Sequence, residues 1–298
     1  MNLFTFIYIV GVFIILNLFQ GFTNISLENQ LIYSSIFILL IGIPHGAIDH
    51  VLFLKKREMP KLKFYSIYLG LSIIFVVLWH ILPTISLVFF LLISAFHFGE
   101  SQFADALFNK IYRFTFYFFW GLCLLSSLMY YNTTELHEIT SFFDDTIILE
   151  KIYDKEKIGI FFYSTNIITI LSIIALLLKN KIDKDRLLSE LFLLFLIHIT
   201  FFLFPFIIGF TLYFVALHSL KVMNDEFKYL KKENINFTIF NFLKLLAPYS
   251  ILSIFGTTLL LFLSYYNYIP YSIPFLAIVI ISVITLPHAI VMNIFYNE

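Results

Sequence analysis

The chain has 298 residues, of which 60% are hydrophobic and 13% charged. Such a composition excludes a water-soluble globular domain and indicates a polytopic helical membrane protein. The net charge is zero, which gives no reason to expect a nucleic-acid partner. Cys123 is the only cysteine, so an intramolecular disulfide and a thiolate metal cluster are both excluded.

Apolar runs of roughly 18 to 25 residues, each suited to crossing a bilayer, recur along the chain. They lie at about 2–20, 31–54, 63–80, 83–106, 111–130, 157–178, 187–204, 205–223, 241–264 and 273–295. We therefore predict an all-α, polytopic transmembrane bundle of about ten helices. Residues 131–156 form a polar, acidic connection whose segment 141–148 is consistent with an interfacial helix or a loop. No linker or repeat divides residues 1–298, which we expect to form a single transmembrane domain.

Lysine and arginine residues predict the orientation of these helices. The connections 55–63, 107–113, 179–186 and 221–234 hold five, two, four and four of the 19 basic residues. In a bundle of ten helices all four connections lie on one side, which is the cytoplasmic side by the positive-inside rule. Both termini are therefore predicted to be cytoplasmic.

The run 31–54 contains ionisable residues that a purely structural membrane helix does not need. His45, Asp49 and His50 lie in it, beside Pro44 and Gly46, which can loosen a helix. Polar groups in hydrocarbon are costly unless they have partners, so such residues mark candidate functional sites.

Three further runs carry a histidine at a similar depth. Counted from the same membrane side, His45 and His97 lie 14 residues into their runs, His218 lies 13 and His288 lies 15. At 1.5 Å per residue this is a depth of about 20 Å for all four. Four imidazoles at one depth predict an intramembrane metal site, and an all-histidine set suits ferrous iron that activates oxygen. For any single histidine, a hydrogen bond to a neighbouring helix is the alternative.

Two carboxylates are close to these histidines in the sequence. Asp49 follows His45 by one turn and Glu100 follows His97 by three residues, so each could accept its histidine's ring N–H. A carboxylate that reaches interfacial water is the alternative for Glu100. His50 would join the site only if the preceding turn is distorted. The other histidines are assigned ordinary roles: a hydrogen bond between helices for His198, and interfacial positions for His80 and His137.

The sequence has 39 Phe and 18 Tyr residues, more than a bilayer span requires. Aromatic rings could line a site for a large, flat, apolar ligand, or they could simply face lipid. The candidates nearest the histidines in sequence, which core packing explains equally well, are Trp79, Phe96, Phe98, Tyr213 and Phe214.

Four motifs occur in order along the chain: PHGAIDH at 44–50, HFG at 97–99, LHSLK at 217–221 and PH at 287–288. In these residues the chain resembles the Brp/Blh-type bacterial and archaeal β-carotene 15,15′-dioxygenases. The resemblance implies a multi-pass protein of the bacterial or archaeal cytoplasmic membrane that uses Fe(2+) and O₂. Its reaction would cleave the central double bond of β-carotene to two retinal molecules, which could be handed over to a rhodopsin. It also implies His45, His97 and His218 as iron ligands.

The chain departs from that family's third motif at one position. The motif, His-x-x-Arg/Lys-His, has a second histidine where this chain has Val222. His288 completes the set in our prediction of catalytic and metal-binding residues, which are His45, His97, His218 and His288. His50 is the other candidate for the fourth ligand, and an incomplete site is the third possibility.

Other functions remain open from the sequence. A non-catalytic carotenoid-, retinal- or metal-binding membrane protein is the main alternative, and Val222 favours it. A haem-binding electron carrier and a metal or proton transporter are further classes, although the apolar outer half of the bundle argues against transport. The clustered histidine boxes of diiron desaturases are absent from the sequence.

Overall fold

The computed structural model describes residues 3–18, 25–104, 110–142, 144–152 and 154–297, and these residues form helices and connections without a β-strand. Nine helical stretches within them are long and apolar enough to cross a membrane. They are Leu27–Lys56, Lys61–Ile81, Pro83–Phe103, Tyr112–Tyr131, Lys155–Leu178, Lys184–Leu203, Phe206–Glu233, Ile239–Tyr265 and Ile273–Asn297. The remaining predicted run, 2–20, corresponds to α1 (Leu3–Leu18), an apolar helix of 16 residues. The predicted all-α transmembrane fold is confirmed, while the orientation of the termini stays a prediction.

The stretch Leu27–Lys56 is interrupted where Pro44 and Gly46 occur. It consists of α2 (Leu27–Phe37), a π-helical turn η1 (Ile38–Gly42), a 3₁₀ turn η2 (Ile43–Gly46) and α3 (Asp49–Lys56). Proline has no N–H to donate and its ring clashes with the preceding turn, so it disfavours a regular helix in the turn before it. The sequence left open whether Pro44 and Gly46 distort this turn, and the structure shows that the turn is irregular.

The stretch Phe206–Glu233 is also irregular, although it has no proline or glycine at the irregular turn. It consists of α10 (Phe206–Tyr213), a π-helical turn η4 (Phe214–Ser219) and α11 (Leu220–Glu233). Single π-helical turns are rare and occur frequently at functional sites. Both irregular stretches place a histidine, His45 or His218, in the turn where the helix is broken.

The acidic connection between the fifth and sixth predicted helices contains short helices. α7 (Thr133–Phe142) is followed by a turn and by the 3₁₀ helix η3 (Ile147–Ile152). Thr146 Oγ1 donates to the carbonyl of Thr140 at 2.8 Å, which closes the turn. The segment that the sequence left open between helix and loop therefore contains parts of both.

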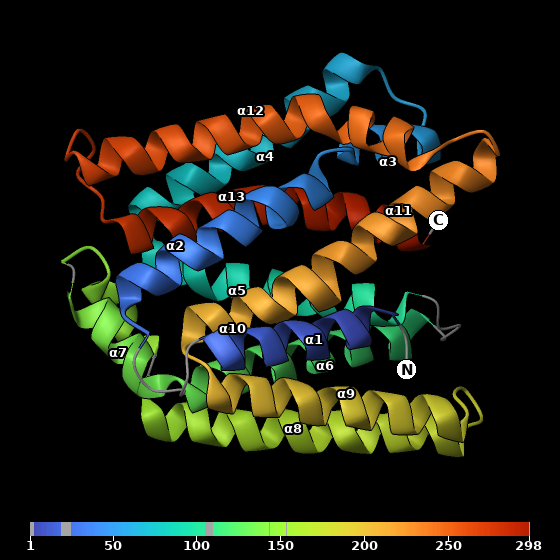
Figure 1. Cartoon of the computed structure of the whole chain (residues 1–298), viewed down its shortest axis with the longest axis horizontal. Helices are drawn as coiled ribbons and strands as arrows, with labels where there is room; N and C mark the ends of the chain where they lie inside the picture. The colour runs from blue at the N-terminus through green and yellow to red at the C-terminus, as the bar shows by residue number, and fades with distance from the viewer. Residues whose placement is uncertain (1–2, 19–24, 105–109, 143, 153, 298) are drawn as a thin grey trace. The chain divides into compact units, whose positions relative to one another are not determined.

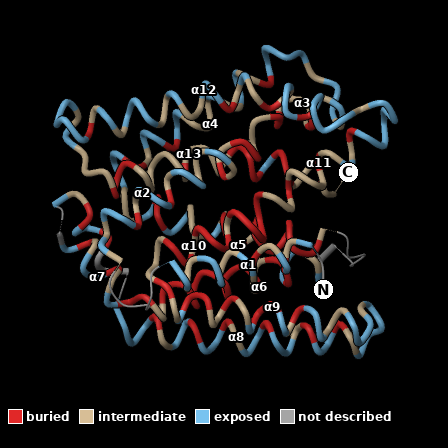
Figure 2. The backbone as a smooth tube through the Cα atoms, viewed as in Figure 1, coloured by how far each residue is buried: buried red, intermediate tan, exposed pale blue. Residues whose placement is uncertain are grey.

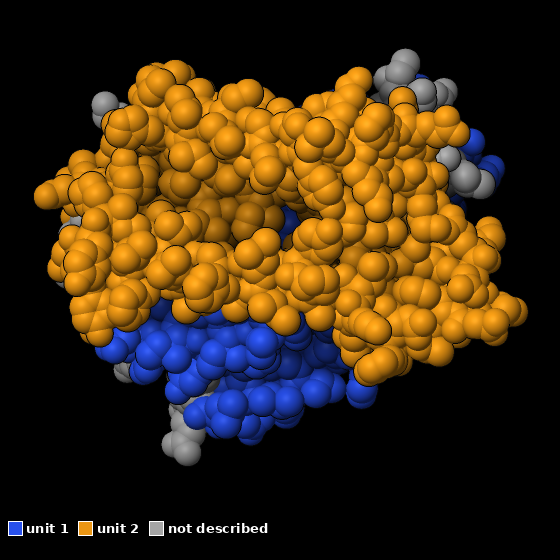
Figure 3. All heavy atoms as spheres, turned by 90° about the horizontal axis from the view of Figure 1, so that it is seen from above, with its two compact units in different colours: residues 1–42, 95–137, 153–221 blue, residues 43–94, 138–152, 222–298 orange. Residues whose placement is uncertain are grey.

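The chain divides into two compact units, each assembled from three separate stretches and coloured separately in Figure 3. Unit 1 comprises residues 1–42, 95–137 and 153–221, and unit 2 comprises residues 43–94, 138–152 and 222–298. The boundaries between the units fall between η1 and η2, inside α5 (Pro83–Phe103), inside α7, after η3 and inside α11. That the units form a single transmembrane domain stays a prediction.

Unit 1 is built around α6 (Lys110–Tyr131), α8 (Lys155–Leu178) and α9 (Lys184–Leu203), which pack side by side (Figure 1). Small polar side chains join α6 to α8: Ser126 Oγ and Thr165 Oγ1 are 2.7 Å apart, and Thr169 Oγ1 donates to the carbonyl of Phe119 at 3.0 Å. Such bonds between helices are a usual source of packing in membranes.

Unit 2 is built around α13 (Ile273–Asn297), which packs on α3, α4 (Lys61–Ile81) and α12 (Ile239–Tyr265) (Figure 1). Trp79 Nε1 donates to Ser282 Oγ at 2.7 Å and joins α4 to α13. Figure 2 shows that α8 and α12 each carry many exposed residues. Because many of these exposed side chains are apolar, the surface suits contact with lipid.

Candidate metal-binding histidines

In unit 2, η2 and α13 bring two histidines together. The rings of His45 and His288 are buried, with centroids 4.6 Å apart and planes at 89°. Gly46 permits this approach, because a Cβ atom at that position would lie only 3.2 Å from His288 Nδ1. His288 follows Pro287 inside α13, so both histidines lie beside a proline in a membrane helix.

Asp49, at the start of α3, orients this pair. Its Oδ1 is 2.9 Å from His288 Nδ1, and its Oδ2 accepts a hydrogen bond from the Tyr68 hydroxyl at 2.8 Å. Since a carboxylate is an acceptor, Nδ1 of His288 carries the hydrogen and the lone pair is on Nε2, the arrangement of a metal-ligating histidine. We expected Asp49 to orient His45, one turn away. In the structure its two carboxylate oxygens instead bond His288 of α13 and Tyr68 of α4.

In unit 1, α5 and η4 bring the second pair together. The ring centroids of His97 and His218 are 4.8 Å apart, with planes at 81°. Both side chains are 1% exposed, so the pair is sealed from bulk water. Phe98 and Phe214 pack on the His218 ring, at centroid distances of 4.9 and 5.5 Å.

Ser101, one turn after His97, selects the tautomer of His218. Its hydroxyl donates to the carbonyl of Phe98 at 3.0 Å and lies 2.9 Å from His218 Nδ1. A hydroxyl that has donated its hydrogen can only accept here, so Nδ1–H of His218 donates to it and the lone pair is on Nε2. The Lys221 ammonium donates to the carbonyl of Ser101, which fixes this turn of α5 against the start of α11.

The other predicted site residues are found in distinct places. Glu100 is fully buried, which contradicts the alternative of a helix-end carboxylate in interfacial water. His50 is half-buried and packs on Tyr249 and Tyr65, with ring centroids 4.5 and 5.9 Å away. Val222 is fully buried in the apolar core of unit 2.

Of the remaining histidines, His198 has its predicted role, while the interfacial positions of His80 and His137 stay predictions. His198 Nδ1 lies 3.1 Å from the Tyr131 hydroxyl, so the expected hydrogen bond between helices is confirmed. His80 is exposed and its Nδ1 lies 2.9 Å from the Tyr271 hydroxyl, while His137 is exposed on α7.

Of the aromatic candidates, Phe98 and Phe214 contact a histidine of the pair in unit 1. Phe96 instead packs on Phe114 at a centroid distance of 4.9 Å, and Trp79 is used in the bond between α4 and α13.

Sequence reasoning missed three residues that support the histidines: Tyr68, Ser101 and Lys221. Ser101 could have been found, because it lies four residues after His97 and so shares its helix face. Tyr68 carries no such signal, since its contact with Asp49 depends on how α4 packs on α3.

The donor chemistry of these residues fits a metal ion. His45, His97 and His288 are buried and each offers a ring nitrogen that could bind a metal. His218 adds a fourth buried imidazole with its lone pair on Nε2. Neutral imidazoles bring no charge into the membrane interior, so such a set can be buried without a counter-ion.

Comparison with known proteins identifies the family of the chain. The family model of β-carotene 15,15′-dioxygenase matches residues 36–296. A β-carotene 15,15′-dioxygenase of an uncultured marine bacterium, 66A03, is 39% identical over 71 residues. That match covers 22% of this chain and 26% of the relative. No solved structure matches the chain. The chain is a multi-pass membrane protein that belongs to the β-carotene 15,15′-dioxygenase family.

Proposed function

We propose that this protein cleaves the central 15,15′ double bond of β-carotene with O₂ and releases two molecules of retinal. His45, His97, His218 and His288 bind one Fe(2+) between them. Bound iron would supply the activation of O₂ that this cleavage requires. The protein acts in the bacterial or archaeal cytoplasmic membrane, where its substrate is dissolved, and its product is available to a rhodopsin.

The observation that carries the proposal is the presence of two buried histidine pairs in a member of this family. His288 and His218 each have an acceptor at Nδ1, namely Asp49 and Ser101, so each directs the lone pair of Nε2 away from that acceptor. The match in depth of the four histidines along their helices supports a single shared ion.

The chain's own residues would act by positioning. Asp49 and Tyr68 hold the ring of His288, and Ser101 with Phe214 holds the ring of His218, so neither imidazole needs to reorganise on binding. β-Carotene has no polar group, so the protein can control which bond is cleaved only through the shape of its apolar surfaces.

Expression in a bacterium that accumulates β-carotene tests this function. Wild-type protein should bleach the cells and produce retinal, whereas His45→Ala, His97→Ala, His218→Ala and His288→Ala should each leave the colour. His80→Ala is the matched control, because His80 is an exposed histidine bonded to Tyr271, and it should bleach as wild type does.

Metal analysis of the purified protein separates the proposed enzyme from the alternative. About one iron per chain is expected in wild type, with loss of iron in the four variants. Bound iron without retinal formation would favour the non-catalytic carotenoid-, retinal- or metal-binding protein, for which Val222 in place of a histidine is the argument. Bleaching by His288→Ala at the wild-type rate would remove His288 from the ligand set.

A further inference from the structure

Helices α6, α8 and α9 of unit 1 enclose a groove of about 560 Å³. Apolar side chains of α8 and α9 line most of it, among them Ile170, Leu191 and Phe195. Tyr131, Asn166 and His198 also line it and are its polar groups. This volume is within the usual range for small-molecule sites, and the lining has their usual character, mainly apolar with a few polar groups.

The imidazole of His198 offers a hydrogen-bond donor in this groove. Its Nδ1 lies 3.1 Å from the Tyr131 hydroxyl, which is the one hydrogen bond that the ring makes among the described residues. A phenol is a stronger acid than an imidazole N–H, so the hydroxyl donates to Nδ1. The hydrogen of the neutral ring is then on Nε2, which can donate to a ligand.

The other polar lining residue is already satisfied. Asn166 Nδ2 donates to the carbonyl of Phe162 at 2.9 Å, and its Oδ1 accepts from Cys123 Sγ at 3.2 Å. A ligand in the groove therefore meets one available donor, at His198, and otherwise apolar surface.

The depth of His198 restricts the ligand. It lies five residues before Leu203, the end of α9, which is about 8 Å along the helix axis. The ester groups of a phospholipid lie at the interface, so its acyl chain would leave the N–H of His198 unsatisfied in hydrocarbon. The groove continues beyond His198 to Leu191, about 10 Å further along α9. It therefore suits a single apolar chain with one acceptor atom at its end.

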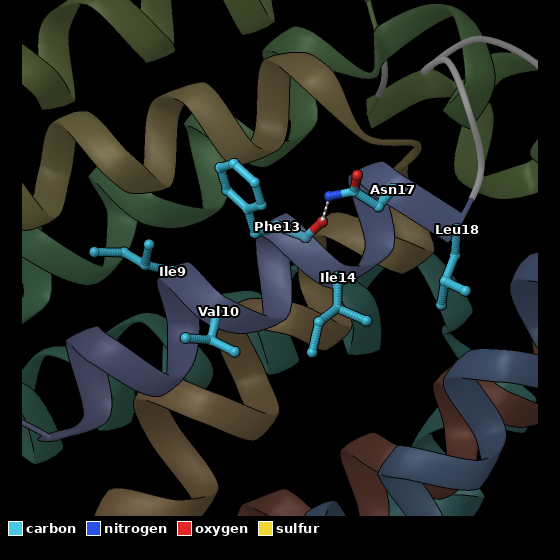
Figure 4. A pocket seen from close by; sticks show the side chains of 6 residues that line it. All are labelled: Ile9, Val10, Phe13, Ile14, Asn17 and Leu18. Atoms are coloured by element: carbon cyan, nitrogen blue, oxygen red, sulfur yellow. Dashed lines mark hydrogen bonds between the residues drawn. The ribbon is translucent and has the colours of Figure 1, made fainter.

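A second hollow, beside α1, lacks such a donor. Its lining side chains all come from this one helix and are shown in Figure 4. Asn17 is the polar residue among them, and its amide donates to the carbonyl of Phe13 at 2.7 Å. An apolar hollow without an available polar group gives no indication of a ligand.

We propose that the groove between α6, α8 and α9 binds retinal, the product, at a site separate from the two histidine pairs. The aldehyde oxygen accepts a hydrogen bond from Nε2 of His198, and the C20 chain lies on Ile170, Leu191 and Phe195. This inference rests on the proposed function, which makes an isoprenoid aldehyde of this size inside the same membrane.

Binding is tested with the full chain purified into lipid nanodiscs. All-trans-retinal is titrated while tryptophan fluorescence is followed, and the hydrocarbon analogue without the carbonyl oxygen is titrated in parallel. Wild type should bind retinal saturably and about five- to tenfold more tightly than the hydrocarbon, as one hydrogen bond allows. His198→Phe should abolish this preference, and His198→Gln, which keeps an N–H donor, should restore part of it.

The apolar part of the groove is tested with two matched substitutions on α9. Leu191→Phe fills the groove and should weaken the binding of both molecules. Leu188→Phe makes the same change at a residue that is 63% exposed and does not line the groove, and it should bind as wild type does. If His198→Phe does not accumulate as folded protein, Tyr131→Phe replaces it, because without the hydroxyl the ring no longer has a selected tautomer and the preference should fall.

The inference is overturned if wild type shows no saturable retinal binding, if His198→Phe keeps the preference for the aldehyde, or if Leu188→Phe weakens binding as much as Leu191→Phe. Bleaching of β-carotene is read separately in cells. Bleaching without groove-dependent retinal binding removes this inference alone, whereas retinal binding without bleaching removes the proposed function.

Discussion

Gly121 of α6 lies directly against the backbone of α5, and replacing it with alanine tests how closely these helices must pack. A Cβ atom at position 121 would lie 1.7 Å from the carbonyl oxygen of Ala95 and 2.4 Å from its carbonyl carbon. Cβ atoms essentially never approach other heavy atoms within 3.0 Å, so the two backbones would have to separate by about 1.3 Å. The obstacle is backbone, which cannot rotate away as a side chain does. Because Ala95 is two residues from His97, the separation would also displace that histidine.

The energetic cost can be worked out from this geometry. Overpacking typically costs about 1–3 kcal/mol, and a clash with backbone belongs at or above the upper end. Alanine recovers about 1 kcal/mol through its higher helix propensity. We therefore expect Gly121→Ala to lower the free energy of unfolding by about 2–3 kcal/mol, which corresponds to a Tm about 4–12 °C lower. Thermal unfolding of the purified protein, followed by circular dichroism, measures this change.

Gly70→Ala in α4 is the matched control. A Cβ atom at position 70 meets nothing within 4 Å, so only the gain in helix propensity applies and Tm should stay the same or rise slightly. Equal Tm values for the two variants, or retention of wild-type Tm by Gly121→Ala, would refute the close approach of α5 and α6.

Four further substitutions test residues that support the histidines or pack the two units internally. Val222→His introduces a polar ring at a position that is fully buried among apolar side chains. It should lower the free energy of unfolding by about 2–4 kcal/mol, measured by thermal unfolding, and metal analysis should find no additional iron. Tyr68→Phe removes the hydroxyl bonded to Asp49 and should weaken iron binding about tenfold in competition with a chelator. Ser101→Ala should do the same through His218, whereas Ser94→Ala, whose hydroxyl has no hydrogen-bond partner among the described residues, should not. Trp79→Phe loses the bond to Ser282 and should lower the free energy of unfolding by about 1–2 kcal/mol in the same thermal assay.

The positions of the membrane helices could be predicted from the sequence because the bilayer acts on each segment separately. A backbone in hydrocarbon must satisfy its own hydrogen bonds, so an apolar run of sufficient length becomes a helix whatever packs against it. Nine of the ten predicted runs correspond to long apolar helices, and the first corresponds to the shorter α1. The irregular turn at His45 was also marked locally, by Pro44 and Gly46.

The histidines were selected by the same reasoning, since an ionisable side chain in hydrocarbon is costly wherever its partners lie. The sequence did not show which histidine each partner orients. Asp49 was expected to serve His45, four residues away, but its hydrogen bond is to His288, 239 residues further along the chain. No proline or glycine marks the π-helical turn at His218. Gly121 looks in the sequence like any other glycine in a helix, although Ala95 leaves no room there for a Cβ.

The sequence by itself therefore determined which segments cross the membrane and which histidines need an explanation, because both follow from the cost of moving a residue out of water. Only the tertiary structure decided which side chains orient those histidines, which helices approach within backbone contact and where the second helix break falls. These depend on contacts between residues far apart in the chain, and no local pattern records them.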